Sequence, residues 1–238
     1  MNSLEQKVYQ YKPPATVQSV LSGTKTVFLV GTAGAGKDTV MQKLLSNSNY
    51  HFIISHTTRA PRENHGVIEV DGEDYHFIDL AIAEKMIDNQ EFVEVKYVHG
   101  NVYGTSLAGL ELAHKNGSIA ISDIEVQGVA EYRALSSEVM PIFLLPPDFE
   151  TWIKRLKQRY IGNIDENELI KRLNTAKQEL LEALEKPYFE YVINKDLDTT
   201  VRIVDEIAHG SKSSAKNEQA KTIAKSLLKD LEQYLAKN

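Results

Sequence analysis

The chain has 238 residues, of which 42% are hydrophobic and 25% are charged, and it contains no cysteine. This length suits one α/β domain with a small subdomain, and the lack of cysteine excludes disulfides and thiolate metal sites. The net charge of −6 argues against a nucleic-acid partner, and no stretch is apolar for long enough to span a membrane, so we expect a cytoplasmic protein.

Residues 1–24 are polar and contain Pro13 and Pro14. They precede the first strongly apolar run of the chain. We expect an N-terminal arm that either packs on the domain or stays partly mobile.

A glycine-rich segment, Gly31-Thr32-Ala33-Gly34-Ala35-Gly36-Lys37-Asp38-Thr39, lies between an apolar run at residues 26–30 and a helical pattern that continues to about residue 46. Strand, glycine-rich turn and helix in this order predict a phosphate-binding loop, in preference to a loop that only makes a tight turn. Glycines let backbone N–H groups converge on a phosphate, and the helix adds the positive end of its dipole. Lys37 would reach the β- and γ-phosphates of a nucleoside triphosphate. The expected ATP-binding residues are Gly31, Gly34, Ala35, Gly36, Lys37, Asp38 and Thr39.

Two arginines follow the next predicted strand, which covers residues 51–55. Arg59 and Arg62 lie three positions apart on a loop that Pro61 stiffens. Each guanidinium offers a planar fork of donors that suits a phosphate, whereas the alternative is an ordinary solvated loop.

The next predicted elements are strands at residues 73–78 and 91–98 and helices at 82–89 and 106–115, with turn-rich links at 66–72 and 100–104. On strict alternation, Phe92 and Glu94 share one face of their strand and Val95 lies on the opposite face.

A buried-looking strand at residues 118–124 carries Asp123 near its carboxyl end. In open α/β sheets ligands bind beyond the carboxyl ends of the strands, and an acid there, downstream of a phosphate-binding loop, is the usual partner of Mg²⁺ or its waters. A helix is expected from residue 125, followed by another core strand at 140–145.

Two helices at residues 148–159 and 165–185, joined at 160–163, suit a closing lid. Arg155 and Arg159 lie four residues apart and therefore share a helix face, and Arg172 is on the second helix. A lid would bring this positive charge to a transferring phosphoryl group, and the alternative is a solvated basic face. The last predicted elements of the domain are a strand at 191–194 and a helix at 198–208.

Residues 209–238 change in character, with a Ser/Lys-rich linker ahead of an amphipathic helix. Ala220, Ala224, Leu227 and Leu231 recur at helical spacing. Docking on its own domain is the simpler interpretation, and self-association or binding to a partner is the alternative. The sequence leaves the oligomeric state open.

Taken in order, these segments resemble the guanylate kinase family over about residues 25–208. The most specific matches are Ser55-His-Thr-Thr-Arg59-Ala-Pro-Arg62, Asp71-Gly-Glu-Asp-Tyr75-His-Phe77, Glu91-Phe-Val-Glu94, Tyr103-Gly-Thr105, Asp123-Ile-Glu125-Val-Gln-Gly128, and Arg155-Leu with Arg159 and Arg172-Leu. Each match is weak alone, but their order behind a phosphate-binding loop is specific.

The resemblance implies a P-loop α/β fold with a three-layer parallel sheet and helices on both faces, a small GMP-binding subdomain at residues 56–105 and a helical lid at 148–172. It implies transfer of a phosphoryl group from ATP to GMP, and to dGMP, with Mg²⁺. The implied GMP-binding residues are Ser55, Glu94, Thr105 and Glu125 for the guanine, and Arg59, Arg62, Tyr75 and Tyr103 for the phosphate. The implied catalytic residues are Lys37, Arg155, Arg159 and Arg172, and Asp123 would order the metal.

The chain departs from the family pattern at Asp38, where a serine is usual. The Asp38 carboxylate would either ligate Mg²⁺ or disfavour ATP. Glu125 replaces the usual aspartate, and the segments between Arg62 and Tyr75 and after Arg159 are longer.

Two other functions therefore stay open. One is a kinase of the same fold that acts on another phosphorylated small molecule, which the sequence Gly36-Lys-Asp-Thr39 suggests; Ser55 and Glu94 argue against it. The other is a non-catalytic binding module, and the presence of Lys37 argues against that.

Overall fold

A computed structural model of the chain describes residues 3–64, 67–158, 165–211 and 214–237. The chain forms two compact units. Unit 1 comprises residues 1–25, 49–120 and 134–138, and unit 2 comprises residues 26–48, 121–133 and 139–238.

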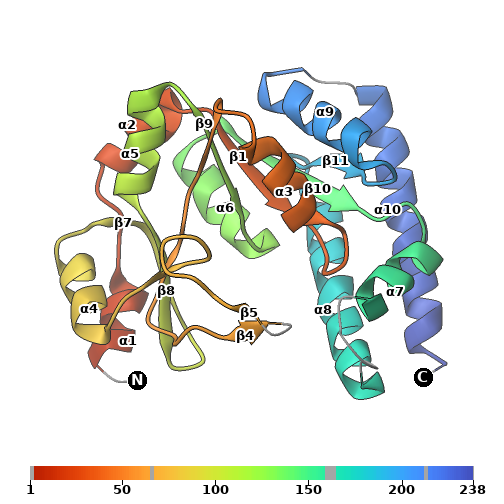
Figure 1. The fold of residues 1–238 in the computed structure, drawn as a ribbon, viewed down its shortest axis with the longest axis horizontal. Helices are drawn as coiled ribbons and strands as arrows, with labels where there is room; N and C mark the ends of the chain where they lie inside the picture. Colours follow the sequence, from red (N-terminus) through yellow and green to blue (C-terminus); the bar gives the residue numbers. More distant parts are fainter. Residues whose placement is uncertain (1–2, 65–66, 159–164, 212–213, 238) are drawn as a thin grey trace. The chain divides into compact units, whose positions relative to one another are not determined.

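Among the described residues, helices and strands alternate along much of the chain (Figure 1). The helices are α1 (Ser3–Gln10), α2 (Thr16–Gly23), α3 (Lys37–Leu45), α4 (Leu80–Asp88), α5 (Leu107–Asn116), α6 (Val126–Leu135), α7 (Phe149–Gln158), α8 (Glu166–Glu185), α9 (Leu197–Ala208) and α10 (Ser214–Leu235). The strands are β1 (Thr26–Val30), β2 (Tyr50–Phe52), β3 (His56–Thr57), β4 (Glu63–Asn64), β5 (Val67–Ile68), β6 (His76–Phe77), β7 (Phe92–Val98), β8 (Asn101–Ser106), β9 (Ile119–Asp123), β10 (Val139–Leu145) and β11 (Glu190–Ile193).

Unit 2 is built on a parallel sheet that includes the strand order β11-β10-β1-β9. β1 pairs in parallel with β10, with Thr26 opposite Val139, and β10 pairs in parallel with β11, with Ile142 opposite Glu190. All residues of β1 are buried, as is typical of parallel sheets that helices cover. Helices flank this sheet (Figure 1). The predicted α/β class with a helix-flanked parallel sheet is confirmed.

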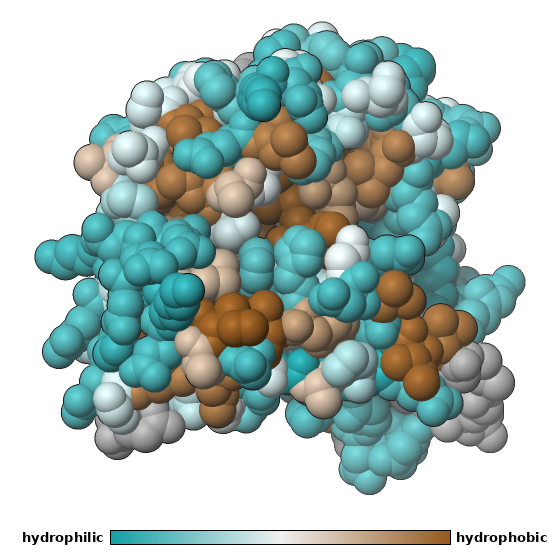
Figure 2. Space-filling model, turned by 60° about the vertical axis from the view of Figure 1, so that its left-hand side comes forward, coloured by the Kyte–Doolittle hydropathy of each residue, from teal (hydrophilic) through white to brown (hydrophobic). Residues whose placement is uncertain are grey.

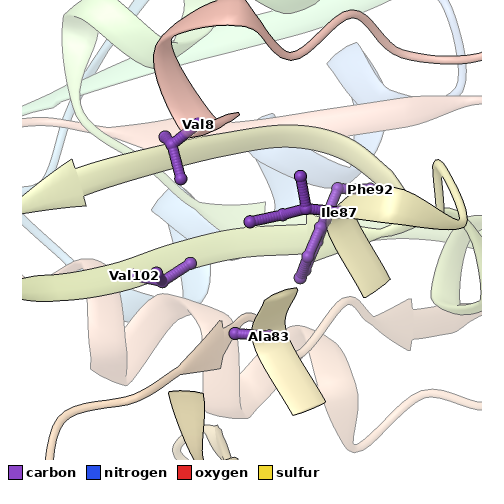
Figure 3. Close-up of a cluster of buried hydrophobic side chains, with 5 residues drawn as sticks. All are labelled: Val8, Ala83, Ile87, Phe92 and Val102. Atoms are coloured by element: carbon purple, nitrogen blue, oxygen red, sulfur yellow. The ribbon is translucent and has the colours of Figure 1, made fainter. Parts of the chain in front are cut away.

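Unit 1 contains a mixed sheet with the order β6-β3-β8-β7. β7 and β8 form a hairpin whose two-residue loop, His99 and Gly100, has positive φ at both positions (50° and 85°). This geometry matches the twist of paired strands. A hydrophobic cluster covers one face of the sheet and joins Phe92 to side chains from α1 and α4 (Figure 3).

Helix α10 docks on its own unit. Its buried side chains are Ala220, Ala224, Leu227 and Leu231. It packs on α8 and β11, beside which it runs in Figure 1. The Asn217 side chain accepts a hydrogen bond of 2.8 Å from the backbone N–H of Tyr191 on β11. Of the two predicted alternatives, the structure shows intramolecular docking.

Several predicted segments differ from the structure: residues 16–23 of the expected arm form α2, and the link expected at 66–72 contains β5, which pairs with β4. Residues 3–10, expected only as part of a polar arm, form α1, and the arm packs on unit 1 because Val8 is buried in its cluster. Residues 101–106, expected mainly as a link, form β8, because the turn at His99 and Gly100 returns the chain along β7. Other boundaries shift by a few residues.

The predicted face of Phe92 is also wrong. Strict alternation groups Phe92 with Glu94, but Phe92 packs in the same cluster as Val95. The register of β7 against β8 shifts between Phe92 and Glu94. A slip of one residue turns a strand side chain to the other face.

The surface is mainly hydrophilic with separate hydrophobic patches on the face that Figure 2 draws. The exposed apolar side chains include Val67, Ile68 and Val70, which lie in and next to β5. No helix in the described part of the chain is long and apolar enough to cross a membrane.

Replacing Leu231 by alanine should lower the free energy of unfolding by about 2 to 4 kcal/mol, because truncation of a fully buried side chain leaves a cavity. Gln233 is exposed on the same helix, so Gln233→Ala should change this free energy by less than about 0.5 kcal/mol. Urea denaturation followed by circular dichroism measures both. Small and equal effects would show that α10 is not docked in solution.

Candidate active site

Strand β1, the glycine-rich loop and α3 follow one another in the order that the sequence predicts, and α3 begins at Lys37, inside the glycine-rich segment. Gly36 has a φ of 90°, and a Cβ at this position would collide with the side-chain amide of Asn194. Gly31 has a φ of 145°, and its Cβ would lie 2.5 Å from the Leu144 carbonyl oxygen. Both positions therefore require glycine, and the tight turn into α3 depends on them.

Side chains from two other elements hold the carbonyl groups of this loop. The indole N–H of Trp152 on α7 donates to the Ala33 oxygen at 2.8 Å. The side-chain amide of Asn194, directly after β11, donates to the Ala35 oxygen at 2.8 Å. Because these oxygens are bound by the protein, the N–H groups at the start of α3 can face an anion.

A cavity of about 550 Å³ lies at this loop. Its lining residues are Thr32, Gly34, Gly36, Lys37, Asp38, Thr39, Arg155, Asn194, Lys195 and Leu197. The Arg155 guanidinium donates to the Asn194 carbonyl oxygen at 3.0 Å. Lys37, Arg155 and Lys195 give this lining three positive charges. Asp38 adds one negative charge, so the cavity suits an anionic ligand such as a triphosphate.

The other residues predicted for the triphosphate side belong to the same unit. Asp123 is exposed at the end of β9. Arg172 lies on α8, where its Nε is 2.9 Å from the Glu168 carboxylate, and it is not among the residues that line the cavity. Arg159 lies outside the described residues.

Asp38 and Asp123 are the candidate ligands for Mg²⁺. Asp38 is exposed in the first turn of α3, and Asp123 is exposed at the carboxyl end of β9. Within the described ranges, no group of three or more His, Cys, Asp or Glu side chains is arranged to hold a metal by itself. Mg²⁺ usually binds one or two carboxylates and completes its shell with phosphate and water oxygens. Asp38 and Asp123 are ligands of this kind, and both belong to the unit that holds the phosphate-binding loop.

One acid near the loop is not evident from the sequence motifs. Burial raises the pKa of Glu179 on α8 to about 7; the Glu125 carboxylate acts in the same direction and the Lys37 ammonium opposes it. Position 179 falls on the helix between the buried residues Ala176 and Leu180. In the sequence, the position of Glu179 beside the apolar stripe of its helix was the signal that this acid could be buried. Near neutral pH this carboxyl group is therefore partly protonated.

Three of the predicted guanine-binding residues lie together in unit 1. The Thr105 hydroxyl on β8 donates to the Glu94 carboxylate on β7 at 2.9 Å, and the Ser55 and Thr105 hydroxyl oxygens are 3.4 Å apart. Since Thr105 gives its proton to Glu94, Ser55 is the donor in the second contact. The first contact orients the Glu94 carboxylate, and the second holds the Thr105 hydroxyl that makes it. The fourth predicted residue, Glu125, is an exposed residue of unit 2 directly before α6.

The four predicted phosphate-binding residues also belong to unit 1. The buried Arg59 guanidinium donates to both Glu69 oxygens (2.7 and 3.0 Å) and lies 5.3 Å from the centre of the Tyr75 ring. The Tyr103 ring meets the Tyr75 ring edge-on at 6.3 Å. Arg62 has an exposed side chain, and its backbone N–H donates to Glu69 at 2.7 Å. The Arg59 hydrogen bond lowers the pKa of Glu69, and the Arg62 N–H adds to this effect, so the carboxylate stays charged.

His56 follows Ser55 and contacts two aromatic rings. Its ring centre lies 4.7 Å from that of His76 and 5.9 Å from that of Phe92. Burial lowers the pKa of His56 to about 4, and His76 acts in the same direction. Its Nδ1 atom is buried and has no hydrogen-bond partner in the described part of the chain. His56 is therefore neutral at pH 7.

Comparison with known proteins gives one consistent result. A family model described as guanylate kinase matches residues 23–210, a span that contains all of the predicted site residues. Guanylate kinase 1 of Oryza sativa subsp. japonica is 41% identical to the chain over 179 residues, and guanylate kinase of Schizosaccharomyces pombe is 34% identical over 187 residues. A crystal structure of guanylate kinase from Anaplasma phagocytophilum is similar with a TM-score of 0.56 and 27% identity, covering 81% of this chain and 86% of that chain.

The relatives differ in length. The match covers 74% of this chain and 45% of the rice protein, and 77% of this chain and 89% of the S. pombe protein. Guanylate kinase 1 of Arabidopsis thaliana, 37% identical, is covered to 43% of its length. The chain thus spans less than half of these two plant relatives and most of the S. pombe relative.

Lowering the pH from 7 to 5 should destabilise the fold through His56. The pKa of its imidazole falls from 6.5 to about 4 on folding. At pH values between the folded and unfolded pKa, His56 binds a proton more readily in the unfolded chain than in the folded chain. The free energy of unfolding therefore falls as the pH falls through this range. We expect this group to contribute a loss of about 2 kcal/mol.

Denaturant unfolding at pH 7 and pH 5 measures this loss. His56→Gln should remove most of it, whereas the control variant His51→Gln, in the same unit, should retain it. If His56→Gln keeps the full dependence on pH, the buried imidazole is not its source.

Proposed function

The chain belongs to the guanylate kinase family, and from this premise we propose that it transfers the terminal phosphoryl group of ATP to GMP, and to dGMP, giving ADP and the corresponding diphosphate. The observation that carries the proposal is the Glu94 carboxylate, which Thr105 holds in one orientation. A carboxylate in this position favours a guanine nucleotide as the acceptor. The donor side rests on the cationic cavity at the phosphate-binding loop.

Glu94 would read the base through two neighbouring hydrogen bonds. Guanine presents N1–H and N2–H₂ as adjacent donors, and a carboxylate accepts both. Adenine has an acceptor at N1, which would leave the acid unpaired. Sites built to bond a specific donor reject analogues that lack it by orders of magnitude. Thr105 supports this role because it holds the carboxylate in one orientation before the base arrives, and Ser55 holds the Thr105 hydroxyl.

The GMP phosphate would bind Arg59, Arg62, Tyr75 and Tyr103. The Arg59 guanidinium is kept in place by Glu69 and by the Tyr75 ring, and the exposed Arg62 side chain can swing onto a phosphate. Planar guanidinium forks match phosphate oxygens, and two tyrosine hydroxyls add donors that carry no charge.

On the donor side, Lys37 would bind the β- and γ-phosphates, with N–H groups of the loop and of α3 around them. Asp38 and Asp123 would hold Mg²⁺, which when bound neutralises charge on the phosphate oxygens. Arg155, Arg159 and Arg172 would stabilise the charge of the transferring group. Transfer of this kind needs in-line positioning and cations in place of a protein nucleophile.

We further propose that residues 56–105 act as the GMP-binding subdomain and residues 148–172 as a lid. Their closure would exclude water, which otherwise hydrolyses the triphosphate. The net charge of −6 and the cysteine-free composition fit a cytoplasmic enzyme of nucleotide metabolism that binds neither nucleic acid nor membranes.

A coupled assay of ADP release tests the proposal, with ATP, Mg²⁺ and one acceptor at a time: GMP, dGMP, AMP, CMP or UMP. We expect turnover with GMP and dGMP alone. Lys37→Ala should lower it by roughly 10²-fold or more, as expected for losing a group that stabilises the developing charge, and should leave GMP binding nearly unchanged. Turnover on a different acceptor would favour the related kinase, and GMP binding without any turnover would favour a binding module.

Glu94→Gln should raise the KM for GMP by roughly 10- to 100-fold, the scale of one charge-assisted hydrogen bond. It should also narrow the preference for GMP over AMP, because an amide no longer accepts both guanine donors. Glu111→Gln, an exposed change in the same unit, serves as the matched control. An unchanged GMP/AMP ratio would show that another residue reads the base.

A further inference from the structure

Strand β7 contains a bulge directly before the residue proposed to read guanine. Phe92 pairs with Ser106 of β8 and Glu94 pairs with Thr105, so β7 advances two residues where β8 advances one. The extra residue lets Phe92 enter the cluster on one face of the sheet while Glu94 meets Thr105.

The Tyr11 hydroxyl binds the backbone at this bulge. It donates to the Phe92 carbonyl oxygen at 2.6 Å and accepts from the Phe92 N–H at 3.0 Å. β7 is the last strand in its sheet order, so the hydroxyl takes the place of a further strand for this one residue. Burial raises the pKa of Tyr11 above its ordinary value, so the hydroxyl keeps the proton that it donates.

Helix α1 holds Tyr11 in this position. Val8 is buried in the cluster that contains Phe92 (Figure 3), and the Tyr11 ring lies edge-on to the Phe92 ring at 6.4 Å. One turn earlier, the Lys7 ammonium lies 2.8 Å from the Asp88 carboxylate at the end of α4. The arm is therefore tied both to the cluster and to the helix that precedes β7.

On β8, Gly104 limits where the bulge can go. A Cβ at Gly104 would lie 2.8 Å from the Phe92 ring and 2.9 Å from the Glu94 carbonyl oxygen. The Phe92 ring thus packs directly on the β8 backbone, and Tyr11 holds the same residue from the sheet edge. Phe92 is fixed by both contacts, and Glu94 follows it by two residues.

We propose that Tyr11 is a positioning residue for Glu94: by holding the bulge at Phe92 it sets the Glu94 carboxylate toward the guanine of the acceptor nucleotide. This inference rests on the proposed function. Tyr11 precedes residue 23, where the family-model match begins, so it lies outside the matched span. Without the hydroxyl, both backbone groups of Phe92 lose their partner, and pairing can relax toward a regular register that turns Glu94 away from Thr105.

Tyr11→Phe tests the inference because it removes the hydroxyl and retains the ring. Tyr9→Phe is the matched control, since Tyr9 lies on α1, two residues before Tyr11, and is 84% exposed. For Tyr11→Phe we expect the KM for GMP to rise about 3- to 10-fold, the scale of one hydrogen bond, and the GMP/AMP preference to fall by a similar factor. The KM for ATP should change less than about twofold. Tyr9→Phe should match the unchanged chain in every value.

A second readout is amide hydrogen exchange at Phe92, which should accelerate in Tyr11→Phe and stay unchanged in Tyr9→Phe. A purely structural role for Tyr11 would lower the melting temperature without a selective change in the KM for GMP. If Tyr11→Phe does not fold, Val8→Ala replaces it, and the same selective rise in the KM for GMP is expected, because α1 then holds Tyr11 less firmly.

The outcomes separate the two proposals. If the unchanged chain turns over GMP and Tyr11→Phe equals Tyr9→Phe in its KM for GMP and its GMP/AMP ratio, the positioning role is overturned and the proposed function stands. If the unchanged chain turns over no guanine nucleotide, the proposed function fails and this inference fails with it.

Discussion

A loop that turns its N–H groups toward a phosphate must have its carbonyl oxygens satisfied by the protein behind it. Here Trp152, Asn194 and Lys37 donate to three of these oxygens. Much of unit 2 follows from this requirement. Asn194 reaches the loop because it directly follows β11, which pairs with β10. The backbone N–H of Asn194 donates to the Leu145 carbonyl oxygen of β10 at 2.7 Å and continues this pairing. Trp152 reaches it because α7 packs its buried face over the loop.

The lysine and arginine side chains proposed to bind phosphate are also held by the protein. Among the described residues, each of these side chains that is buried or partly buried donates to an acceptor of the protein. Arg59 bonds Glu69, Arg155 bonds the Asn194 oxygen, and Lys37 bonds the Gly31 oxygen. A buried cation without a partner would be costly, and a cation already held in place loses less side-chain entropy when a phosphate arrives. The contacts therefore stabilise the fold and prepare the site together.

The sequence predicts the strand, glycine-rich loop and helix of the phosphate-binding segment, because these depend on local pattern and order. The residues proposed for the two nucleotide sites come from the order of short motifs along the chain. The sequence does not predict contacts that depend on pairing between distant residues. The sequence of residues 101–106 is typical of a link, and these residues form a strand only because the turn at His99 and Gly100 pairs them with β7. The bulge at Phe92 interrupts the period-2 alternation of β7, and nothing in the local sequence indicates a bulge there. Glu69 and Glu179 are likewise ordinary acids until folding brings them to Arg59 and Lys37.

The residues before position 23 and after position 210, outside the span of the family model, each cover the edge of a sheet. A sheet edge exposes backbone donors and acceptors that invite pairing with other chains. At the β7 edge the Tyr11 hydroxyl bonds the backbone of Phe92, and at the β11 edge the Asn217 side chain accepts from the N–H of Tyr191. In each case an amphipathic helix brings the side chain, α1 beside β7 and α10 beside β11. Each helix thus buries its own apolar face and caps an edge strand, so a change in either helix acts first on the edge that it caps.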